Sequence, residues 1–415
     1  MNPVPGLPIV CLGCGCLCDD IPPAARFSGN QWPASAISCE LGREWLGRER
    51  PAFPPSRVGG KPASLEQALT AAAELLASAS SPLVCGWAGQ TLEGQRAAVA
   101  LADRLGALAD WTSGPEALAH HAAFQQQGAS TATLGEVRRR ADLVVYWGCD
   151  PRESHPRHLS RFVRPPDDGA SPRRVWCVSD DPGADFADER AALLGGDHLA
   201  TLAALRMLIR GEAIEASAPL RQLASALTSS GYVAVFYSHT LAGAGHAGLG
   251  ALAALCQELH AHTRCVALPL GAQGNPHGAE SVLAWQTGYP AAVSFASGAP
   301  RYAPQQYNTA ALLTGGRVDA ALVAGDDLLA HTTPQAAEAL RAAPYVALGY
   351  EDSATLRAAR VAIAIAEPGA ACGGTVLRVD GVPLELRPFR DDQLPTAAEV
   401  LTELLDRITP PRLTS

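Results

Sequence analysis

The sequence predicts an α/β protein built from two related units with parallel sheets, behind a small cysteine-rich cap at the N-terminus. Three observations lead to this fold class. Short apolar strands alternate with Ala/Leu-rich helical segments, and the alternation occurs twice along the chain. Five of the eleven cysteines lie between Cys11 and Cys39. The length of 415 residues exceeds the roughly 250–300 residues at which single cores stop growing, so we expect several domains.

The predicted cap spans residues 1–56. It contains the cysteine-rich segment and ends in a proline-rich stretch with Pro51, Pro54 and Pro55. Proline breaks helices and lacks a backbone donor, so this stretch is a plausible domain boundary.

The first α/β unit is predicted over residues 57–200. A helical run from Ser64 to Ser78 precedes a strand from Pro82 to Trp87 and a helix from Leu92 to Leu108. Two further apolar strands end in polar loops at Gly148 to Pro151 and Ser179 to Pro182. In open α/β sheets, ligands bind at such carboxyl-end loops.

The second α/β unit is predicted over residues 201–348, because its strands match those of the first. The matched strands are Tyr232 to Tyr237, Val318 to Ala324 and Pro344 to Gly349. A long segment rich in Gly and Pro, from Gly271 to Gln306, is expected to be a functional loop. Residues 349–415 are expected to add edge strands, including a period-2 run from Thr375 to Leu386, and a closing helix from Thr396 to Ile408.

Charge and hydropathy exclude some classes of partner. The net charge of −9 argues against general binding to nucleic acid or anionic membranes, because phosphate binding depends on basic charge. No stretch reaches the roughly 18 apolar residues of a membrane span. We therefore expect a cytoplasmic protein that binds neither nucleic acid nor membrane.

The strongest chemical motif is the set Cys11, Cys14, Cys18 and Cys39. Closely spaced thiolates plus one distant ligand are typical of tetrahedral metal sites, so we expect either a [4Fe-4S] cluster or zinc. Cys16 is expected to point away from the metal. The alternative is a run of inert thiols.

Four segments resemble the B subunit of formylmethanofuran dehydrogenases, and they span nearly the whole chain. They are Cys11 to Ile21, Tyr146 to Arg161, Trp285 to Pro290 with Tyr302, and Gly374 to Pro383. The resemblance implies a relative of the molybdopterin oxidoreductases. Members of that fold hold a [4Fe-4S] cluster on the four-cysteine motif, bind a tungsten or molybdenum bis-pterin in the loops, and ligate the metal with a Cys or selenocysteine.

Two departures from the family pattern put the redox centre in doubt. The metal-ligating cysteine belongs near Asp110 to His120, yet no cysteine lies between Cys85 and Cys149. His120 or His121 would be a poor substitute for a soft thiolate. Asp150 stands where the family has Asn, and its charge would repel pterin phosphates. We therefore expect no tungsto- or molybdopterin and no catalytic residue.

The resemblance and the basic run after Asp150 together supply the candidate binding residues. Guanidinium groups bind carboxylates and phosphates bidentately, so they suit an anionic carrier tail. A solvated helix start and aromatic loop anchors are the simpler alternatives. The candidates are Asp150, Arg152, Ser154, His155, Arg157, His158, Arg161, Gly288, Tyr289, Tyr302 and Arg378.

The resulting functional expectation is a non-redox B subunit of a formyltransferase/hydrolase complex in methylotrophic one-carbon metabolism. It would scaffold the partner subunits and bind a methanofuran-type C1 carrier. Two alternatives stay open: an active tungsten or molybdenum formylmethanofuran dehydrogenase subunit, and a zinc-stapled structural subunit with no ligand pocket.

Overall fold

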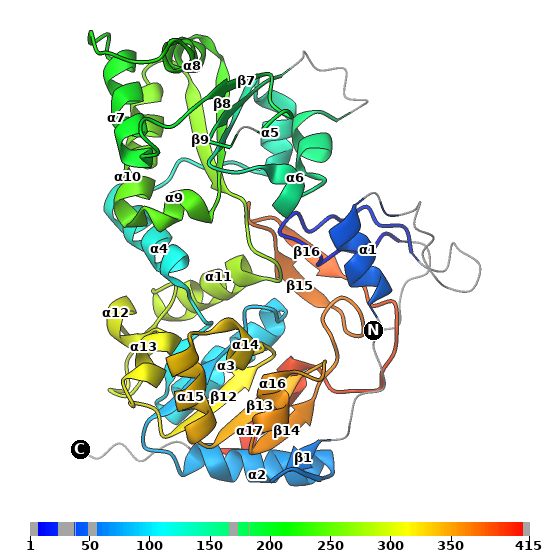
Figure 1. The fold of residues 1–415 in the computed structure, drawn as a ribbon. Coiled ribbons are helices and arrows are strands. Elements are labelled where there is room, and N and C mark those ends of the chain that lie inside the picture. The colour runs from blue at the N-terminus through cyan, green and yellow to red at the C-terminus, as the bar shows by residue number, and fades with distance from the viewer. Residues whose placement is uncertain are drawn as a thin grey trace.

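A computed structural model of the chain describes residues 7–23, 37, 39–48, 56–165, 173–181 and 183–409. Two α/β lobes lie one above the other in Figure 1, with the N-terminal segment and a β-hairpin packed at the side of their junction. The expected α/β class with parallel sheets is confirmed. No helix in the described ranges is long and apolar enough to cross a membrane. The predicted boundary at Pro51, Pro54 and Pro55 lies outside the described residues.

The larger lobe is built on a mixed sheet that, within the described chain, has nine strands in the order β11-β10-β4-β3-β12-β13-β14-β1-β2. The strands from β4 to β14 pair in parallel, and antiparallel strands cover both margins. The strands are β1 (Arg57–Val58), β2 (Lys61–Pro62), β3 (Pro82–Cys85), β4 (Leu108–Asp110), β10 (Val293–Ser294), β11 (Arg301–Tyr302), β12 (Ala320–Ala324), β13 (Tyr345–Gly349) and β14 (Val361–Ala364).

Helices cover both faces of this sheet, where two apolar clusters form its core. They are α2 (Leu65–Ala77), α3 (Leu92–Leu105), α11 (Pro276–Thr287), α12 (Pro304–Tyr307), α13 (Thr309–Thr314), α14 (Leu328–His331), α15 (Pro334–Ala342), α16 (Ala354–Ala358) and α17 (Ala397–Arg407). Caps set several boundaries: Ser64 and Thr396 close capping boxes on α2 and α17, and left-handed Gly106 ends α3.

The smaller lobe holds a parallel sheet whose five described strands run in the order β7-β6-β5-β8-β9. The strands are β5 (Leu143–Trp147), β6 (Arg174–Val178), β7 (Glu189–Ala191), β8 (Tyr232–Tyr237) and β9 (Arg264–Pro269). The helical segments are α4 (Pro115–Gln127), α5 (Leu134–Arg140), α6 (Pro151–Ser154), the π-helical turn η4 (Leu159–Val163), α7 (His198–Ile209), α8 (Ala218–Ser229), α9 (His239–Gly243) and α10 (Gly245–Leu259).

The cysteine-rich segment and the C-terminal hairpin cover one face of the smaller sheet. Ile9, Leu17 and Trp45, the last on α1 (Glu40–Gly47), share a core cluster with inward side chains of β5, β6, β8 and β9. The same cluster includes residues of β15 (Gly374–Leu377) and β16 (Pro383–Leu386). The cap is therefore packed into the core of the smaller lobe.

The sheets do not follow the unit boundary expected after residue 200. β3 pairs with β12, and β5 pairs with β8, so each sheet combines strands from both expected units. The smaller lobe is an insertion between β4 and β10 of the larger one. Sequence similarity among strands did not reveal this, because buried parallel strands share one apolar pattern whichever sheet they join.

Two other expectations differ from the structure. The predicted loop from Gly271 to Gln306 contains the helix α11 as well as short strands and turns. The run from Thr375 to Leu386 forms a separate two-stranded antiparallel sheet, β15-β16, and does not add to an edge of a large sheet. Its period-2 pattern reflects one buried face, since Val376, Leu384 and Leu386 are buried.

Candidate functional site

The predicted metal-binding cysteines lie in one buried segment. Residues 9–21 fold back on themselves: Ile9 pairs with Ile21, and the Cys11 amide donates to the Cys18 carbonyl at 2.8 Å. Cys39 is the N-cap of α1, and its Sγ accepts from the Gly42 amide at 3.4 Å.

Cys11 and Cys39 approach each other from the loop and the helix. A Cβ placed on Gly42 would lie 3.2 Å from Cys39 Sγ and 3.5 Å from Cys11 Sγ. Cys11 Sγ also accepts from the Gly13 amide at 3.4 Å. Both thiols therefore face the same small glycine-lined space.

Cys16 lies among the other thiols, and its expected orientation away from a metal stays a prediction. It is buried, and its thiol lies in hydrogen-bonding contact with those of Cys14 and Cys18. That hydrogen bond is the main cause that lowers the pKa of Cys18 to about 6, with Arg161 and Arg157 adding to the effect. By contrast, burial raises the pKa of Cys11 to about 12.

The geometry of a metal site at Cys11, Cys14, Cys18 and Cys39 is not shown. No group of three or more His, Cys, Asp or Glu side chains in the described ranges is arranged to hold a metal ion.

Two of the predicted anion-binding arginines bind carboxylates of the cysteine segment. Arg157 makes a bidentate pair with Asp20, at 2.6 and 2.5 Å. Arg161 contacts Asp20 at 2.7 Å and also pairs with Asp19. Burial by itself raises the pKa of Asp20, but the two guanidinium groups outweigh it and lower the pKa. The four groups carry no net charge and clamp the segment onto the region of η4.

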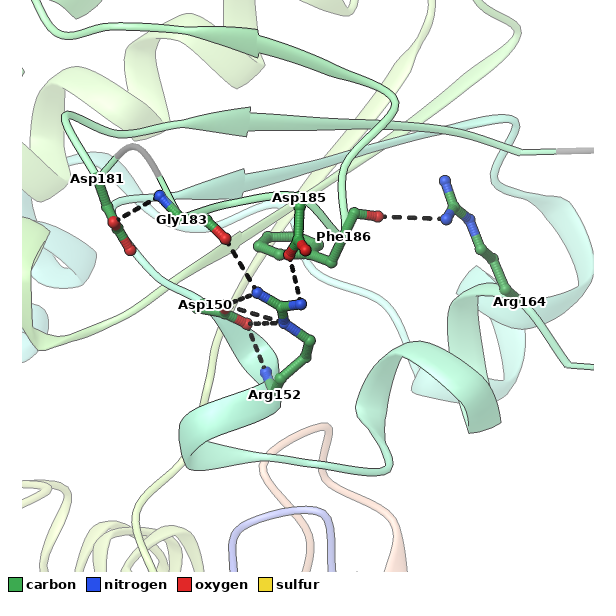
Figure 2. A network of polar contacts seen from close by, with 7 residues as sticks. All are labelled: Asp150, Arg152, Arg164, Asp181, Gly183, Asp185 and Phe186. Atoms are coloured by element: carbon green, nitrogen blue, oxygen red, sulfur yellow. Dashed lines mark hydrogen bonds and ion pairs between the residues drawn. The ribbon is translucent and has the colours of Figure 1, made fainter.

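Arg152 lies in a separate network, shown in Figure 2. Its guanidinium group contacts Asp150 at 2.6 Å, Asp185 at 2.6 Å and the Gly183 carbonyl at 3.1 Å. It also lies over the ring of Phe186. Asp150 is the N-cap of α6 and accepts from the Arg152 amide at 2.8 Å. The charge of Asp150 is therefore balanced within the chain.

The two predicted histidines are buried and act within the protein. His158 Nδ1 lies 2.8 Å from the Tyr146 hydroxyl, and burial lowers its pKa to about 3. His155 Nε2 lies 2.8 Å from the Gly271 carbonyl, and Nδ1 lies 2.9 Å from Ser154 Oγ. Burial also lowers the pKa of His155. Neither imidazole therefore adds positive charge beside the arginines at neutral pH.

Of the remaining predicted residues, Arg378 lies beside His158 and Arg161, because its guanidinium group and that of Arg161 both lie 5.3 Å from the ring centroid of Phe162. Arg378 is buried and pairs with Asp380 at 2.7 and 2.8 Å. Gly288 is the left-handed C-cap of α11. The rings of Tyr289 and Tyr302 stack with centroids 5.1 Å apart. The structure therefore brings His155, His158, Arg161 and Arg378 together around Phe162, but not Gly288, Tyr289 and Tyr302.

A cavity of about 640 Å³ lies where the two lobes meet, and it was not predicted. Its walls come from α4, α10, α11, the ends of β8 and β9, and the turn after β15 (Figure 1). Most of its lining is apolar, including Trp111, Phe124, Leu249, Leu252 and Pro269.

Polar side chains gather on the α4 and α11 walls of this cavity. His121 Nε2 lies 3.4 Å from Glu280 Oε1, and His277 Nδ1 lies 3.9 Å from Glu280 Oε2. His120 Nδ1 lies 3.1 Å from the Tyr237 hydroxyl, and burial lowers the pKa of His120. Two sequence signals pointed here: adjacent histidines on a helix, and a Tyr at the carboxyl end of a parallel strand.

Comparisons with known proteins agree with the resemblance seen in the sequence. No family model matches the chain. The B subunit of the tungsten-containing formylmethanofuran dehydrogenase 2 of Methanocaldococcus jannaschii is 29% identical, over 92% of this chain and 93% of that protein. The equivalent protein of Methanococcus maripaludis is 29% identical, over 96% and 98%.

Two further matches come from Methylorubrum extorquens. The B subunit of its formyltransferase/hydrolase complex Fhc is 28% identical, over 85% of this chain and 97% of the relative. A chain in the crystal structure of that complex, FhcABCD with methylofuran, superposes with a TM-score of 0.74 and 27% identity, over 85% of this chain and 98% of that chain. Sequence and fold therefore agree that this chain is a homologue of the B subunits of formylmethanofuran dehydrogenases and of the formyltransferase/hydrolase complex.

Proposed function

We propose that this chain is the non-redox B subunit of a formyltransferase/hydrolase complex. In that role it scaffolds the partner subunits and binds a methanofuran-type carrier of one-carbon units. The observation that carries the proposal is the structural match over 98% of a chain from the FhcABCD complex with methylofuran. The free thiols of all eleven cysteines fit a reducing compartment, so we place the complex in the cytoplasm of a methylotroph.

The proposal that this chain has no redox activity is supported by the lack of a cysteine in the region where the family has its metal-ligating thiolate. The sequence has no cysteine from residue 86 to 148. No arginine or lysine of the described chain lines the junction cavity, although the phosphates of a bis-pterin dinucleotide would need such partners. Cys256 lines the cavity, but its Sγ lies 3.4 Å from Cys265 Sγ in a buried thiol pair.

The test is purification of the tagged full-length chain from its native host under anaerobic conditions. We expect partner subunits to co-purify, carrier to be found by mass spectrometry of the denatured extract, and tungsten and molybdenum to be substoichiometric. One equivalent of either metal, together with oxidation of formate by artificial acceptors, would contradict the proposal.

A second candidate is an active tungsten-containing dehydrogenase subunit. It is favoured by the two methanogen relatives, which match at least as much of this chain as the Fhc protein does. The same purification separates the two functions, because only the dehydrogenase requires tungsten and transfers electrons.

We also propose that Cys11, Cys14, Cys18 and Cys39 hold a [4Fe-4S] cluster or zinc in the assembled protein. The donor set is suitable, since backbone amides donate to Cys11 Sγ and Cys39 Sγ, and such bonds stabilise thiolate ligands. When bound, a cluster would supply electron transfer and zinc would fix the cap on the smaller lobe. Zinc with no carrier in the extract would favour a purely structural role.

The ligand assignment is tested by single cysteine variants. Cys14→Ser and Cys39→Ser should lose the metal and lower Tm, whereas Cys16→Ser should keep it. Metal content is measured by mass spectrometry, and an absorption shoulder in the visible range distinguishes iron-sulfur from zinc. Equal metal loss in all three variants would contradict the choice of ligands.

A further inference from the structure

Two cysteine thiols of the smaller lobe lie against each other in its core. Cys256 is in the last turn of α10, and Cys265 follows on β9, nine residues further along the chain. Their sulfur atoms are 3.4 Å apart, and the Cys265 thiol donates to Cys256 Sγ. A disulfide bond is about 2.05 Å long, so the two sulfurs need to approach by roughly 1.4 Å to form one.

The backbone on both sides of this pair is fixed by hydrogen bonds. The Cys256 carbonyl accepts from the His260 amide at 3.2 Å, at the end of α10. The Cys265 carbonyl accepts from Ser130 Oγ at 2.8 Å and lies 2.8 Å from His260 Nε2. Cys265 is also paired with Val233 of β8 in the parallel sheet. The contact between the two thiols is therefore part of the fold, and does not depend on two mobile side chains.

The hydrogen bond gives the two thiols different chemical roles. Because Cys265 is the donor, its proton stabilises negative charge on Cys256 Sγ. The same bond, followed by burial, raises the pKa of Cys265 well above its usual value. The thiolate is the reactive form of cysteine, so Cys256 is the better nucleophile of the pair.

The pair is shielded from the outer surface but can be reached through the junction cavity. Cys256 is 1% exposed and Cys265 is 0% exposed. Of the cysteines in the described ranges, Cys256 alone lines the cavity, next to apolar Leu252 and Ala267. The cavity opens to solvent, because exposed Phe124 also lines it. A small neutral oxidant such as hydrogen peroxide can therefore reach Cys256 by this path.

We propose that Cys256 and Cys265 form a modification site that a peroxide closes to a disulfide and a dithiol reductant opens again. Cys256 Sγ attacks one oxygen of hydrogen peroxide, the O–O bond breaks, and the leaving hydroxide takes up the thiol proton and departs as water. Cys265 Sγ then attacks the sulfenic acid sulfur of Cys256. The S–S bond forms, the S–O bond breaks, and the hydroxyl group leaves with the Cys265 proton as a second water. The two thiols lose two electrons in total, and these reduce the peroxide.

The thiol pair is independent of the proposed function, because its oxidation needs no partner subunit, carrier, metal or pterin. The disulfide ties the end of α10 to β9 beside the junction cavity. It takes no part in a reaction of the one-carbon carrier. Failure of the disulfide to form would leave the proposed function standing, and the reverse also holds.

The sequence makes this disulfide easy to identify. Trypsin cleaves after Arg221, Arg264 and Arg301, so Cys256 and Cys265 fall in two neighbouring peptides that contain one cysteine each. The test is to treat the reduced, full-length chain with hydrogen peroxide, alkylate the remaining thiols and digest the protein. We expect mass spectra to show peptide 222–264 linked to peptide 265–301, and dithiothreitol to abolish this link.

Single variants separate the roles of the two cysteines. In Cys265→Ala the sulfenic acid of Cys256 has no thiol partner, so dimedone should label Cys256. In Cys256→Ala dimedone should not label Cys265, which does not line the cavity. Ala253→Phe adds a ring to the cavity wall one turn before Cys256 and should slow formation of the link. Cys85→Ala, which removes a buried thiol of the larger lobe, is the matched control and should form the link as the wild type does.

The opposing results are equally clear. Recovery of both thiols in the reduced form after peroxide treatment of the folded wild type would overturn the inference. Dimedone labelling of Cys265 in Cys256→Ala, as strong as that of Cys256 in Cys265→Ala, would overturn the assigned order of attack. An unchanged rate in Ala253→Phe would overturn entry through the cavity. Circular dichroism checks that each variant is folded.

Discussion

At the scale of single residues, buried titratable groups make the stability of the fold depend on pH. Burial lowers the pKa of His158 to about 3, whereas an unfolded chain would bind a proton near pH 6.5. Between these values the unfolded state binds more protons, so stability falls as the pH falls. The resulting loss of stability is small at pH 7 and reaches its full size only near pH 3.

We therefore predict that His158→Gln reduces the acid sensitivity of the protein. Between pH 7 and pH 5 the wild type should lose about 2 kcal/mol more stability than the variant. The measurement is urea unfolding at the two pH values, and His246→Gln, on an exposed position of α10, is the control. A variant as acid-sensitive as the wild type would show that the buried imidazole does not set this dependence.

Also at this scale, the candidate residues show what sequence alone could and could not give. Cys14, Cys16 and Cys18 lie close together because they are close in sequence, whereas the approach of Cys39 to Cys11 depends on the position of α1. The role of the arginines in binding the carrier stays a prediction, and their partners in the fold are Asp19, Asp20, Asp150 and Asp185. Asp20 and Arg157 are 137 residues apart in the sequence, so their pairing depends on the fold and no local sequence pattern predicts it.

At the scale of elements, the ion pairs between the cysteine segment and η4 fix the position of a loop. We predict that Asp20→Asn leaves the global fold intact but increases amide hydrogen exchange in residues 9–21. The loss in stability should be small, about 1 kcal/mol or less, because the Asp20 side chain is 45% exposed and its pairs are screened. Asp352→Asn, which removes an exposed pair with Arg357, is the control.

The predicted binding of the carrier's anionic tail by Arg157 and Arg161 stays a prediction. The same Asp20 variant tests it. Removal of the competing carboxylate frees the two guanidinium groups. Carrier content of the complex should then rise or stay equal if they bind the tail. A loss of carrier, with faster exchange of the loop, would favour the clamp as their main role.

Helices that begin with a capping box were predicted correctly from the sequence, and helix α11, whose start has no such motif, was not. The expected helices from Ser64 and from Thr396 agree with α2 and α17, because a polar cap and a Gln or Glu three residues later mark both starts. Helix α11 was missed because its N-cap Asn275 makes no capping bond and Gly and Pro surround it. Asn275 instead bonds the Gln90 carbonyl and the Leu377 amide, which are tertiary contacts.

At the scale of the whole molecule, the positions along the chain of the strands that form each sheet determine which parts of the chain can fold alone. The smaller lobe is continuous in sequence, and its sheet takes all five described strands from residues 143–269. The larger sheet needs β3 and β4 from before this insertion, and β10 and β12 from after it. The cavity between the lobes therefore joins a continuous domain to a discontinuous one.

We predict that a fragment of residues 114–271 folds, whereas a fragment of residues 57–200, the unit expected from sequence, does not. The first keeps β5 to β9 together with α4, which packs against α10. The second would leave β3 without β12 and β5 without β8, exposing buried apolar strands and unpaired backbone groups. Circular dichroism and thermal unfolding are the measurements, and a cooperative transition is expected only for 114–271. Part of one face of its sheet is covered by the cap and by β15-β16 in the full chain, so its Tm should lie below that of the intact protein. A cooperative transition in 57–200 would instead mean that the first expected unit holds together without its partners from the second half of the chain.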